Sequence, residues 1–584
     1  MEIRLNPRKN THRRRGLVWF ILIIVLALLL SGSWVYYQHW LESLPSTERV
    51  ELDFDGNPKP IFLDGNQLDT PASGTGEELM LPLDVVQQYI DSNAYYEEET
   101  ESFIITTTDK VIRFQTEQLT VWVNEKPFAL QLPVQKIGEI IYIPIDILQP
   151  YYQFELREDV TTGAVFLLQN GDILQKGIVK VDVDQSELVV HLRTEASIKA
   201  PIAADLNEGD SVMILSEQSD WYQIQLENGW KGFIQEQNLV LSGVEVIHYE
   251  PESQTTNIPW KPLGGKINLT WEAVYNKNPD TKSFIDMPGL NVISPTWFAI
   301  DDDNGNLSNK ANKSFVTWAH GKGYQVWALF SNDTDPDRTS KVLANYETRL
   351  HIIRQLLSYA ALYNLQGINI DFENVYLKDK DKLTQFVREL TPYLHEQNLV
   401  VSIDVAIRGG SEMWSLFADR EALGQTVDYM MVMTYDEYWA SSPVAGSVAS
   451  LPWTEAGIVD IMREDKVPAN KLILGVPYYT RIWSEKFIDN KQKIASKAVS
   501  MEVIDKLIKE KKLTPEFDEA TGQDYVEYTE DKVLNKIWIE NEKSMRARMD
   551  IVKKYNLAGV ASWARVFGNA EIWEAIKDTL EKKP

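Results

Sequence analysis

The chain contains no cysteine and only seven histidines among its 584 residues. The missing thiols exclude disulfides, cysteine nucleophiles and cysteine zinc sites. No two histidines lie two or four residues apart, so the sequence offers no support for a histidine metal site. A net charge of −27 disfavours nucleic-acid binding, which requires a basic surface. We therefore expect no metal, no cofactor and no nucleic-acid partner.

The overall composition is that of an ordinary globular protein. Hydrophobic residues make up 44% of the chain and charged residues 24%, which argues against a disordered or fibrous molecule. A single domain usually holds about 100–200 residues. The length therefore predicts three or four domains, and the pattern of residues along the chain indicates where they begin and end.

The positive charge of the N-terminus precedes a long apolar run. Residues 1–16 carry six arginines or lysines against one glutamate, and residues 17–37 carry no charge. Such a run can cross a hydrocarbon core of about 30 Å as a helix, and basic residues stay on the cytoplasmic side. We expect a cytoplasmic tail at 1–16, a single transmembrane anchor at 17–37 and an extracellular remainder. A cleaved signal peptide is the alternative.

Residues 50–172 show short alternating strands and turn signals, and one phrase occurs twice, at 79–86 and at 141–148. Each copy predicts a strand that ends at proline, followed by a helix capped by aspartate. The segment resembles the copper amine oxidase N-terminal domain. The name implies no copper here, because the segment has no histidine or cysteine. We expect a spacer or a module that contacts the cell wall.

Residues 180–242 form a second β-rich module. They contain a Gly-Asp turn at 209–210, a Trp-Tyr pair at 221–222 and a Gly-x-x-Gly-aromatic run at 229–233. This pattern resembles the bacterial SH3-like barrel, and the resemblance implies contact with peptidoglycan. The alternative is that the tryptophans are only core and edge residues of the barrel. Residues 243–263 lack periodicity and contain three prolines, which predicts a linker.

From residue 264 the pattern changes to apolar strands that alternate with amphipathic helices. Eight near-continuous apolar strands separated by helices predict a (β/α)8 TIM barrel over 264–584. The spacing between the last two runs leaves room for a small α+β insertion at about 484–556. The eight apolar runs are Ile267–Trp271, Val292–Phe298, Gln325–Phe330, Gly367–Phe372, Val400–Val405, Tyr429–Thr434, Leu472–Val476 and Gly559–Trp563.

Polar side chains at the end of the fourth run point to chemistry. A strand alternates faces, so Asn369, Asp371 and Glu373 share one face, and the apolar residues between them share the other. In a TIM barrel the chemistry lies at the carboxyl ends of the strands. Two carboxylates close together raise one pKa, which makes a general acid at neutral pH. We expect this face to point into the barrel, with Glu373 nearest its mouth.

Further polar and aromatic residues follow the later runs. An aromatic floor with converging carboxylates and a tyrosine hydroxyl suits a sugar ring, because the apolar face of the sugar stacks on the indole. Trp271 on the first strand is more simply explained as barrel packing. The residues concerned are Tyr435, Asp436 and Trp439 after the sixth run, Tyr479 and Arg481 after the seventh, and Trp563 at the end of the eighth.

Residues 264–584 resemble glycoside hydrolase family 18, the chitinase-like enzymes, and to a lesser degree its peptidoglycan-acting branch. The resemblance implies that Glu373 is the acid, that Asp371 orients the acetamide of the substrate, and that Tyr435 donates a hydrogen bond to it. Trp563 would form the floor of the subsite that holds the reacting sugar. Asp436, Tyr479 and Arg481 would contact the sugar or brace these groups. The remaining substrate contacts implied are Asn369 and Trp439.

Two positions depart from the family pattern. Gln366 and Asn369 stand where many members have aspartate. Asparagine does not titrate, and its amide can donate a hydrogen bond to Asp371. We therefore expect Asp371 to be a permanent anion rather than half of a proton-sharing pair.

The predicted function is hydrolysis of β-1,4 linkages in glycans that contain N-acetylglucosamine. Peptidoglycan is the favoured partner and a chitin-like glycan the second, since the membrane anchor and the SH3-like module both point to the cell wall. The alternative is a non-catalytic glycan-binding or wall-tethering protein on the same fold. Retention of the acid, the aspartate and the tyrosine together favours the enzyme.

Overall fold

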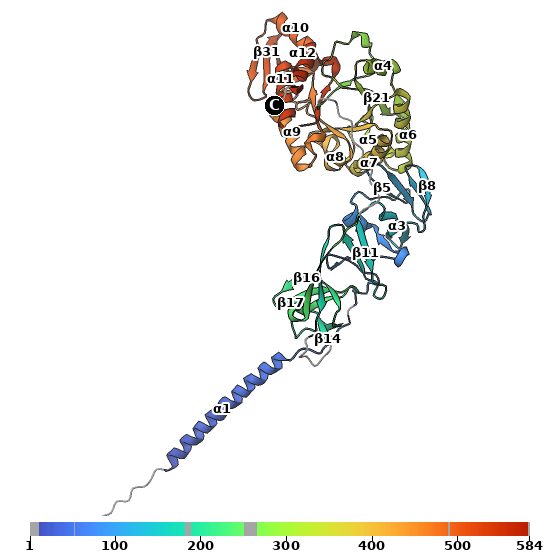
Figure 1. Cartoon of the computed structure of the whole chain (residues 1–584). Coiled ribbons are helices and arrows are strands. Elements are labelled where there is room, and N and C mark those ends of the chain that lie inside the picture. The colour runs from blue at the N-terminus through green and yellow to red at the C-terminus, as the bar shows by residue number, and fades with distance from the viewer. Residues whose placement is uncertain (1–10, 52, 182–188, 250–264, 489–490, 582–584) are drawn as a thin grey trace, which may run out of the picture. The chain divides into compact units, whose positions relative to one another are not determined.

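The computed structural model describes residues 11–51, 53–181, 189–249, 265–488 and 491–581 (Figure 1). The chain divides into two compact units. One comprises Met1–Ser92 with Lys136–Glu252, and the other comprises Asn93–Gln135 with Ser253–Pro584. The start of the predicted tail and most of the predicted linker, residues 1–10 and 250–264, lie outside the described residues.

The N-terminal helix α1 spans Thr11–Ser43. Within its segment Trp19–Ser43, an 18-residue window has a mean hydropathy of 2.2, and none of that window is buried against the rest of the described chain. Among the described helices it is the one long and apolar enough to cross a membrane. Because a signal sequence has the same length and composition, the uncleaved anchor remains a prediction.

The repeated phrase of the sequence folds as two matching strand–helix pairs. Strand β3 (Met80–Pro82) pairs antiparallel with β10 (Ile140–Pro144), so the two copies lie side by side. They lead into the short helices α2 (Leu83–Val85) and α3 (Ile145–Leu148). The expected aspartate caps are wrong, because Pro82 and Pro144 occupy the cap positions and the aspartates fall in the first turn.

Strands β3 and β10 belong to a three-stranded sheet, and four other strands of the first unit form a second sheet. The three-stranded sheet is completed by β9 (Gln135–Ile137), in the order β3-β10-β9. A four-stranded sheet has the order β11-β12-β1-β2. Its strands are β1 (Ile61–Leu63), β2 (Asn66–Gln67), β11 (Phe154–Glu158) and β12 (Val165–Gln169).

The SH3-like module is a seven-stranded sheet of order β15-β14-β18-β17-β16-β13-β19. Leu192, Leu206, Ile224 and Ile234 are buried in its core, and Trp230 packs against that core. Trp230 is thus explained by packing alone. The strands are β13 (Ile173–Val179), β14 (Val189–Arg193), β15 (Ile202–Asn207), β16 (Ser211–Gln218), β17 (Trp221–Gln225), β18 (Lys231–Gln235) and β19 (Leu239–Val246).

A five-stranded antiparallel sheet belongs to the second unit, although the sequence places it inside the 50–172 segment. Ile104 and Val111 of this sheet are buried in the same apolar cluster as the outer core of the barrel. The predicted 50–172 domain is therefore divided between the two units. The strands are β4 (Tyr95–Glu97), β5 (Ser102–Thr106), β6 (Val111–Gln115), β7 (Thr120–Val123) and β8 (Lys126–Ala129).

Eight parallel strands close into a barrel, and the eight predicted runs are confirmed. Pairing of the first strand with both the second and the last closes the ring. A short antiparallel strand, β22 (Leu307–Asn309), extends one edge. The barrel strands are β20 (Ile267–Glu272), β21 (Val292–Ile300), β23 (Gln325–Ser331), β24 (Gly367–Asp371), β25 (Val400–Ala406), β26 (Tyr429–Met433), β27 (Leu472–Pro477) and β33 (Gly559–Trp563).

Side chains of the barrel strands divide between two apolar cores. Leu269, Trp327 and Tyr429 fill the inside of the barrel. Alternate residues of the same strands belong to a second apolar cluster together with residues of the helices. These helices surround the strands (Figure 1). This division explains why the strands are apolar on both faces. The helices are α4 (Lys313–Gly321), α5 (Pro336–Val342), α6 (Tyr346–Tyr363), α7 (Lys380–Glu396), α8 (Arg420–Thr426), α9 (Leu451–Glu464), α11 (Glu542–Lys554) and α12 (Ala570–Glu581).

The insertion between the last two barrel strands is a five-stranded sheet with one helix, α10 (Met501–Lys511). It occupies 480–539 rather than the expected 484–556. Helix α11 follows it and packs into the outer core of the barrel through Met545 and Met549. The strands of the insertion are β28 (Thr480–Ile488), β29 (Lys491–Val499), β30 (Glu516–Asp518), β31 (Gln523–Glu530) and β32 (Val533–Ile539).

Candidate active site

Strand β24 presents its polar face to the inside of the barrel, as the alternation predicts. Ile368 and Ile370 belong to the outer core, whereas Asp371 and Glu373 line a cavity. Asn332 fixes the backbone of Glu373 from both sides. Its Oδ1 accepts from the Glu373 N–H at 3.1 Å, and its Nδ2 donates to the Glu373 carbonyl at 2.8 Å. The position of Glu373 at the rim is thereby set.

The cavity has a volume of about 440 Å³. The residues that line it follow the carboxyl ends of several barrel strands, which is where TIM-barrel enzymes place their chemistry. Carboxylates, a tyrosine and tryptophans therefore meet in one space. Of the residues expected at the site, Asp371, Glu373, Tyr435, Asp436, Trp439, Tyr479 and Trp563 all line this cavity.

Burial and neighbouring charge favour the protonated form of Glu373. Burial raises its pKa, and the nearby Asp436 carboxylate raises it further. Burial also raises the pKa of Tyr435 well above its ordinary value, with Asp404 and Asp371 adding to the effect. Both shifts favour the protonated forms, so Glu373 and the phenol of Tyr435 are the candidate proton donors of the cavity.

Asp436 is held by two donors that follow β27 in the chain. The hydroxyl of Tyr479 donates to Asp436 Oδ1 at 2.6 Å, and Nη2 of Arg481 donates to the same oxygen at 2.8 Å. Arg481 is almost fully buried and is not among the residues that line the cavity. Its place is behind Asp436, as a brace for that carboxylate.

The structure corrects the expectation for Asn369, which was predicted to touch substrate. Its side chain is fully buried inside the barrel and does not line the cavity. Its Oδ1 accepts from Trp271 Nε1 at 2.8 Å, and its Nδ2 donates to Asp404 Oδ1 at 2.8 Å. The amide therefore donates to Asp404 of the next strand rather than to Asp371 as expected.

The surroundings of Asp371 also argue against its expected permanent ionisation. Burial raises its pKa well above the ordinary value, and the charge of Glu373 raises it further. One oxygen of Asp371, Oδ1, is buried and has no hydrogen-bond partner among the described residues. The sequence argument removed the neighbouring carboxylate on β24 and overlooked Asp404, which β25 supplies.

Asp404 is one of the site residues that the sequence analysis missed. It lines the cavity together with Arg408, Trp414 and Trp453. A signal was present, because a carboxylate interrupts the otherwise apolar fifth run. It was not recognised, because the site residues predicted on the later strands lie at or beyond the strand ends, whereas Asp404 lies within β25.

Tryptophans form the apolar walls. Trp563 and Trp271 lie with their ring centroids 6.0 Å apart and an angle of 58° between their planes. Trp271 lines the cavity as well as packing inside the barrel, so it does more than the packing expected of it. Trp439 is 53% exposed and Trp414 47% exposed, which leaves both indoles open to a bound chain.

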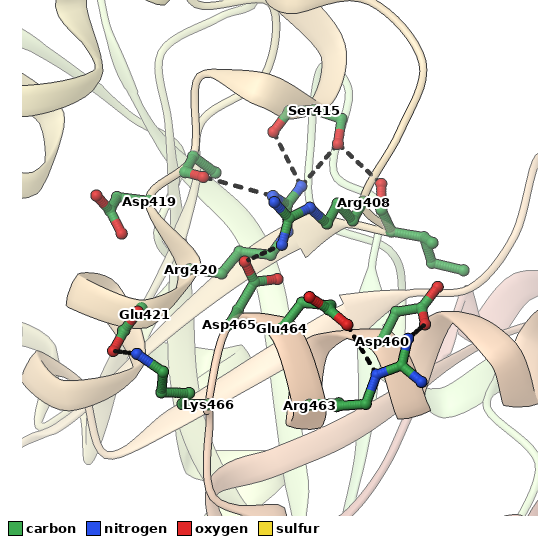
Figure 2. A network of polar contacts seen from close by, with 12 residues as sticks. Arg408, Ser415, Asp419, Arg420, Glu421, Asp460, Arg463, Glu464, Asp465 and Lys466 are labelled. Carbon is green, nitrogen blue, oxygen red and sulfur yellow. Dashed lines mark hydrogen bonds and ion pairs between the residues drawn. The ribbon is translucent and has the colours of Figure 1, made fainter.

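The loop that carries Trp414 is tied down from beneath. Nη2 of the buried Arg420 donates to the Ala406 carbonyl at 2.9 Å and to both the carbonyl and the hydroxyl of Ser415, at 2.9 and 2.7 Å. Figure 2 shows Ser415 above Arg420 in this network. Arg408, which lines the cavity, pairs with Asp465 at 3.1 Å. Hydrogen bonds and an ion pair therefore hold the segment that forms this wall of the cavity.

The sequence model described as "Glycosyl hydrolases family 18" matches residues 270–567, which is the barrel with its cavity. The chain belongs to glycosyl hydrolase family 18. It is a glycosidase. Models of the bacterial SH3 domain and of the copper amine oxidase N-terminal domain match residues 189–240 and 62–167. Both resemblances drawn from the sequence are confirmed.

Three curated relatives are similar to this family 18 chain over the barrel. An uncharacterized glycosylase, YvbX, of Bacillus subtilis (strain 168) is 30% identical over 49% of this chain and 84% of its own length. The cortical fragment-lytic enzyme of the same organism is 23% identical, over 42% of this chain and 57% of its own length. The di-N-acetylchitobiase of Rattus norvegicus is 26% identical, over 47% and 77%.

Proposed function

We propose that this family 18 glycosidase cleaves β-1,4 linkages next to N-acetylglucosamine by substrate-assisted, retaining catalysis. The observation that supports the proposal most is the convergence of Glu373, Asp371, Tyr435 and Trp563 on one cavity at the barrel mouth. The family is known for using the acetamide of the substrate in place of a protein nucleophile. This chemistry needs a protonated acid from the protein but no carboxylate nucleophile, because the acetamide of the substrate takes that role. A cavity with one protonated acid fits it.

The proposed first step breaks the glycosidic bond. Glu373 gives its proton to the leaving oxygen, and the acetamide oxygen of the substrate forms a bond to the anomeric carbon as the old bond breaks. The product is an oxazolinium ion, which carries the positive charge. Asp371 stabilises that charge and orients the acetamide N–H, and Tyr435 donates a hydrogen bond to the acetamide oxygen.

The second step restores the enzyme. A water molecule loses a proton to the carboxylate of Glu373 and adds to the anomeric carbon, so the acetamide bond opens again. Two displacements at the same carbon retain its configuration. Placement of a general acid contributes roughly 10²–10⁴-fold to such a rate.

We favour peptidoglycan as the substrate, with chitin-like chains second. The SH3 match and the apolar N-terminal helix support a cell-wall location for the barrel. In this proposal α1 anchors the protein in the cell membrane with its N-terminus in the cytoplasm and the catalytic unit outside. One relative is named for cortical fragment lysis and another for chitobiose cleavage, so the relatives support both glycans.

The test is digestion of purified peptidoglycan and of chito-oligosaccharides by the full-length chain in detergent, followed by mass spectrometry. We expect new reducing-end N-acetylglucosamine from peptidoglycan, and none from Glu373→Gln. Cleavage of chito-oligosaccharides alone would mean that the substrate is a chitin-like glycan and not peptidoglycan. Binding of both glycans without cleavage would mean that the protein is a non-catalytic glycan-binding protein.

A further inference from the structure

Two carboxylates, the buried Asp404 and the partly buried Asp371, lie on neighbouring strands and line the cavity. β24 and β25 pair in parallel, with Asn369 opposite Ser402 and Ile370 opposite Ile403. The same register, continued by one residue, brings Asp371 opposite Asp404. Neighbouring strands lie about 4.8 Å apart, and residues opposite each other on one face are in contact range. Both side chains line the cavity.

The hydrogen bonds around Asp404 have a fixed direction. The indole Nε1 of Trp271 can only donate, and it donates to Asn369 Oδ1 at 2.8 Å. The amide of Asn369 therefore cannot turn over, and its Nδ2 must point toward Asp404 Oδ1, at 2.8 Å. Asn369 fills the position on β24 next to the pair with a neutral donor. With Oδ1 bound to Asn369, the other oxygen of Asp404 is left to contact Asp371.

Little positive charge compensates the pair. Of the described residues that line the cavity, Arg408 is the one cation, and it pairs with Asp465 at 3.1 Å. Arg481 is bound to Asp436. The other titratable groups that face Asp404 are Glu373 after β24 and Tyr435 after β26, and neither supplies positive charge. Burial, mutual repulsion and the lack of a paired cation therefore favour a single negative charge on the two carboxylates.

We propose that Asp404 is a positioning residue that shares one proton with Asp371, so that the proton rests on Asp404 when Asp371 must be negative. The inference rests on the proposed function, because it assigns Asp371 the role of facing the oxazolinium ion. Position 369 on β24 holds an asparagine and cannot supply a carboxylate. In this proposal Asp404 on β25 supplies that carboxylate instead. Its contact is with Asp371 rather than with the sugar.

The proton balance is closed within the pair. In the resting enzyme one proton lies between Asp371 and Asp404. As positive charge grows at the anomeric carbon, the O–H bond to Asp404 is kept and Asp371 carries the negative charge, stabilised by the Asp404 O–H. After water has added, the proton is again shared. No proton enters or leaves the pair during turnover.

The raised pKa values of both groups agree with this geometry. Burial raises the pKa of Asp404 well above its ordinary value, and the charge of Asp371 raises it further, while the Asn369 amide opposes the shift. Burial likewise dominates the raised pKa of Asp371. Two interacting sites of this kind titrate as a pair with two macroscopic pKa values.

The first test does not depend on activity. Infrared difference spectroscopy of the full-length chain at pH 7, with ¹³C-labelled aspartate carboxyls, compares the wild type with the double variant Asp371→Asn, Asp404→Asn. We expect an aspartic-acid C=O band in the wild type that the double variant lacks. The label separates this band from that of Glu373. Absence of the band overturns the proposal, whether or not the chain cleaves a glycan.

The second test is the pH profile of kcat/KM. Asp404→Leu removes the O–H donor, so the Asp371 anion loses stabilisation and its pKa rises. We expect the acid limb to move to higher pH and kcat at pH 7 to fall roughly 10²-fold, the usual loss for one removed donor. Asp404→Asn keeps a neutral donor and should show a smaller shift in the same direction, with a roughly tenfold loss.

The sign of the shift decides the outcome. If Asp404 were an anion, its removal would relieve repulsion, and the acid limb would move to lower pH instead. A purely structural residue would lower activity without moving either limb. Either result overturns the proposal. Ser402→Ala is the matched control. Ser402 lies on β25, as Asp404 does, and accepts a hydrogen bond from Asn369, but it is not a carboxylate. Both limbs of the pH profile should stay in place in this variant.

Discussion

Arg349 of α6 and Glu97 of β4 form an ion pair of 2.8 Å, with side chains that are 0% and 3% exposed. The same guanidinium makes two bonds of 2.8 Å to Glu389 of α7. The five-stranded sheet is thus joined to the barrel by a buried charge network, and Figure 1 shows β5 and β8 beside α6 and α7. A segment that the sequence assigns to another domain is built into the catalytic unit.

Loss of Glu97 should destabilise the catalytic unit. Glu97→Ala removes one of the two carboxylates around the buried Arg349, which keeps Glu389, and the loss of one buried polar partner costs roughly 1–3 kcal/mol. We expect a lower midpoint in urea for the unfolding transition that also abolishes glycan cleavage. Arg354→Ala removes the exposed pair with Glu125 and should cost under about 1 kcal/mol. Equal midpoints for the two variants would contradict the account of this interface.

The basic limb of the pH profile should depend on Asp436. Burial and then the Asp436 charge raise the pKa of Glu373, and the acid works only while protonated. Asp436→Asn removes a repelling charge, so the pKa of Glu373 falls and the basic limb of kcat/KM moves to lower pH. Asp460→Asn on the outer helix α9 is the control and should leave the limb in place. An unmoved limb in Asp436→Asn would mean that another group sets it.

The two tryptophans Trp439 and Trp563 should have different kinetic effects. Trp439 lies half-exposed at the rim, so Trp439→Ala should raise KM roughly tenfold, equivalent to about 1.4 kcal/mol, with kcat little changed. Trp563 lies against Trp271 at the base of the cavity, so Trp563→Ala should lower kcat. Steady-state kinetics on oligosaccharides measures both. The reverse assignment of kcat and KM effects would contradict the placement.

Removal of Arg420 should loosen the cavity wall. Arg420→Met leaves the carbonyls of Ala406 and Ser415 without their donor, while the apolar stem of the side chain is kept. We expect a raised KM for long glycans with the circular dichroism spectrum preserved, because Trp414 is no longer held. Lys466→Ala removes an exposed pair with Glu421 nearby (Figure 2) and should have no effect on KM. Equal kinetics for both variants would show that the position of the Trp414 segment does not depend on Arg420.

Much of the barrel was predictable because its physics is local. Strands buried on both faces are near-continuously apolar, and Asp371 and Glu373 stood out because carboxylates are costly in such a place. The sequence could not show that β4–β8 join the barrel, since that depends on packing between distant segments such as Glu97 and Arg349.

The site was predicted less completely than the barrel. Register between neighbouring strands decides which side chains meet, and it brings Asp404 beside Asp371. No single run contains that information. The burial of Asn369 and the position of Arg481 behind Asp436 likewise follow from three-dimensional packing. The reactive residues could be predicted from individual strands. The residues that hold them in place come from neighbouring strands, and these could not be predicted.

The central claim is that the substrate's own acetamide displaces the leaving group after Glu373 has protonated it. The most direct measurement is the anomeric configuration of the first product, followed by proton NMR in the minutes before mutarotation. We predict that the new reducing end appears as the β-anomer, which is retention of a β-linkage, and that Glu373→Gln releases none. First appearance of the α-anomer would mean a single displacement by water and would contradict the account.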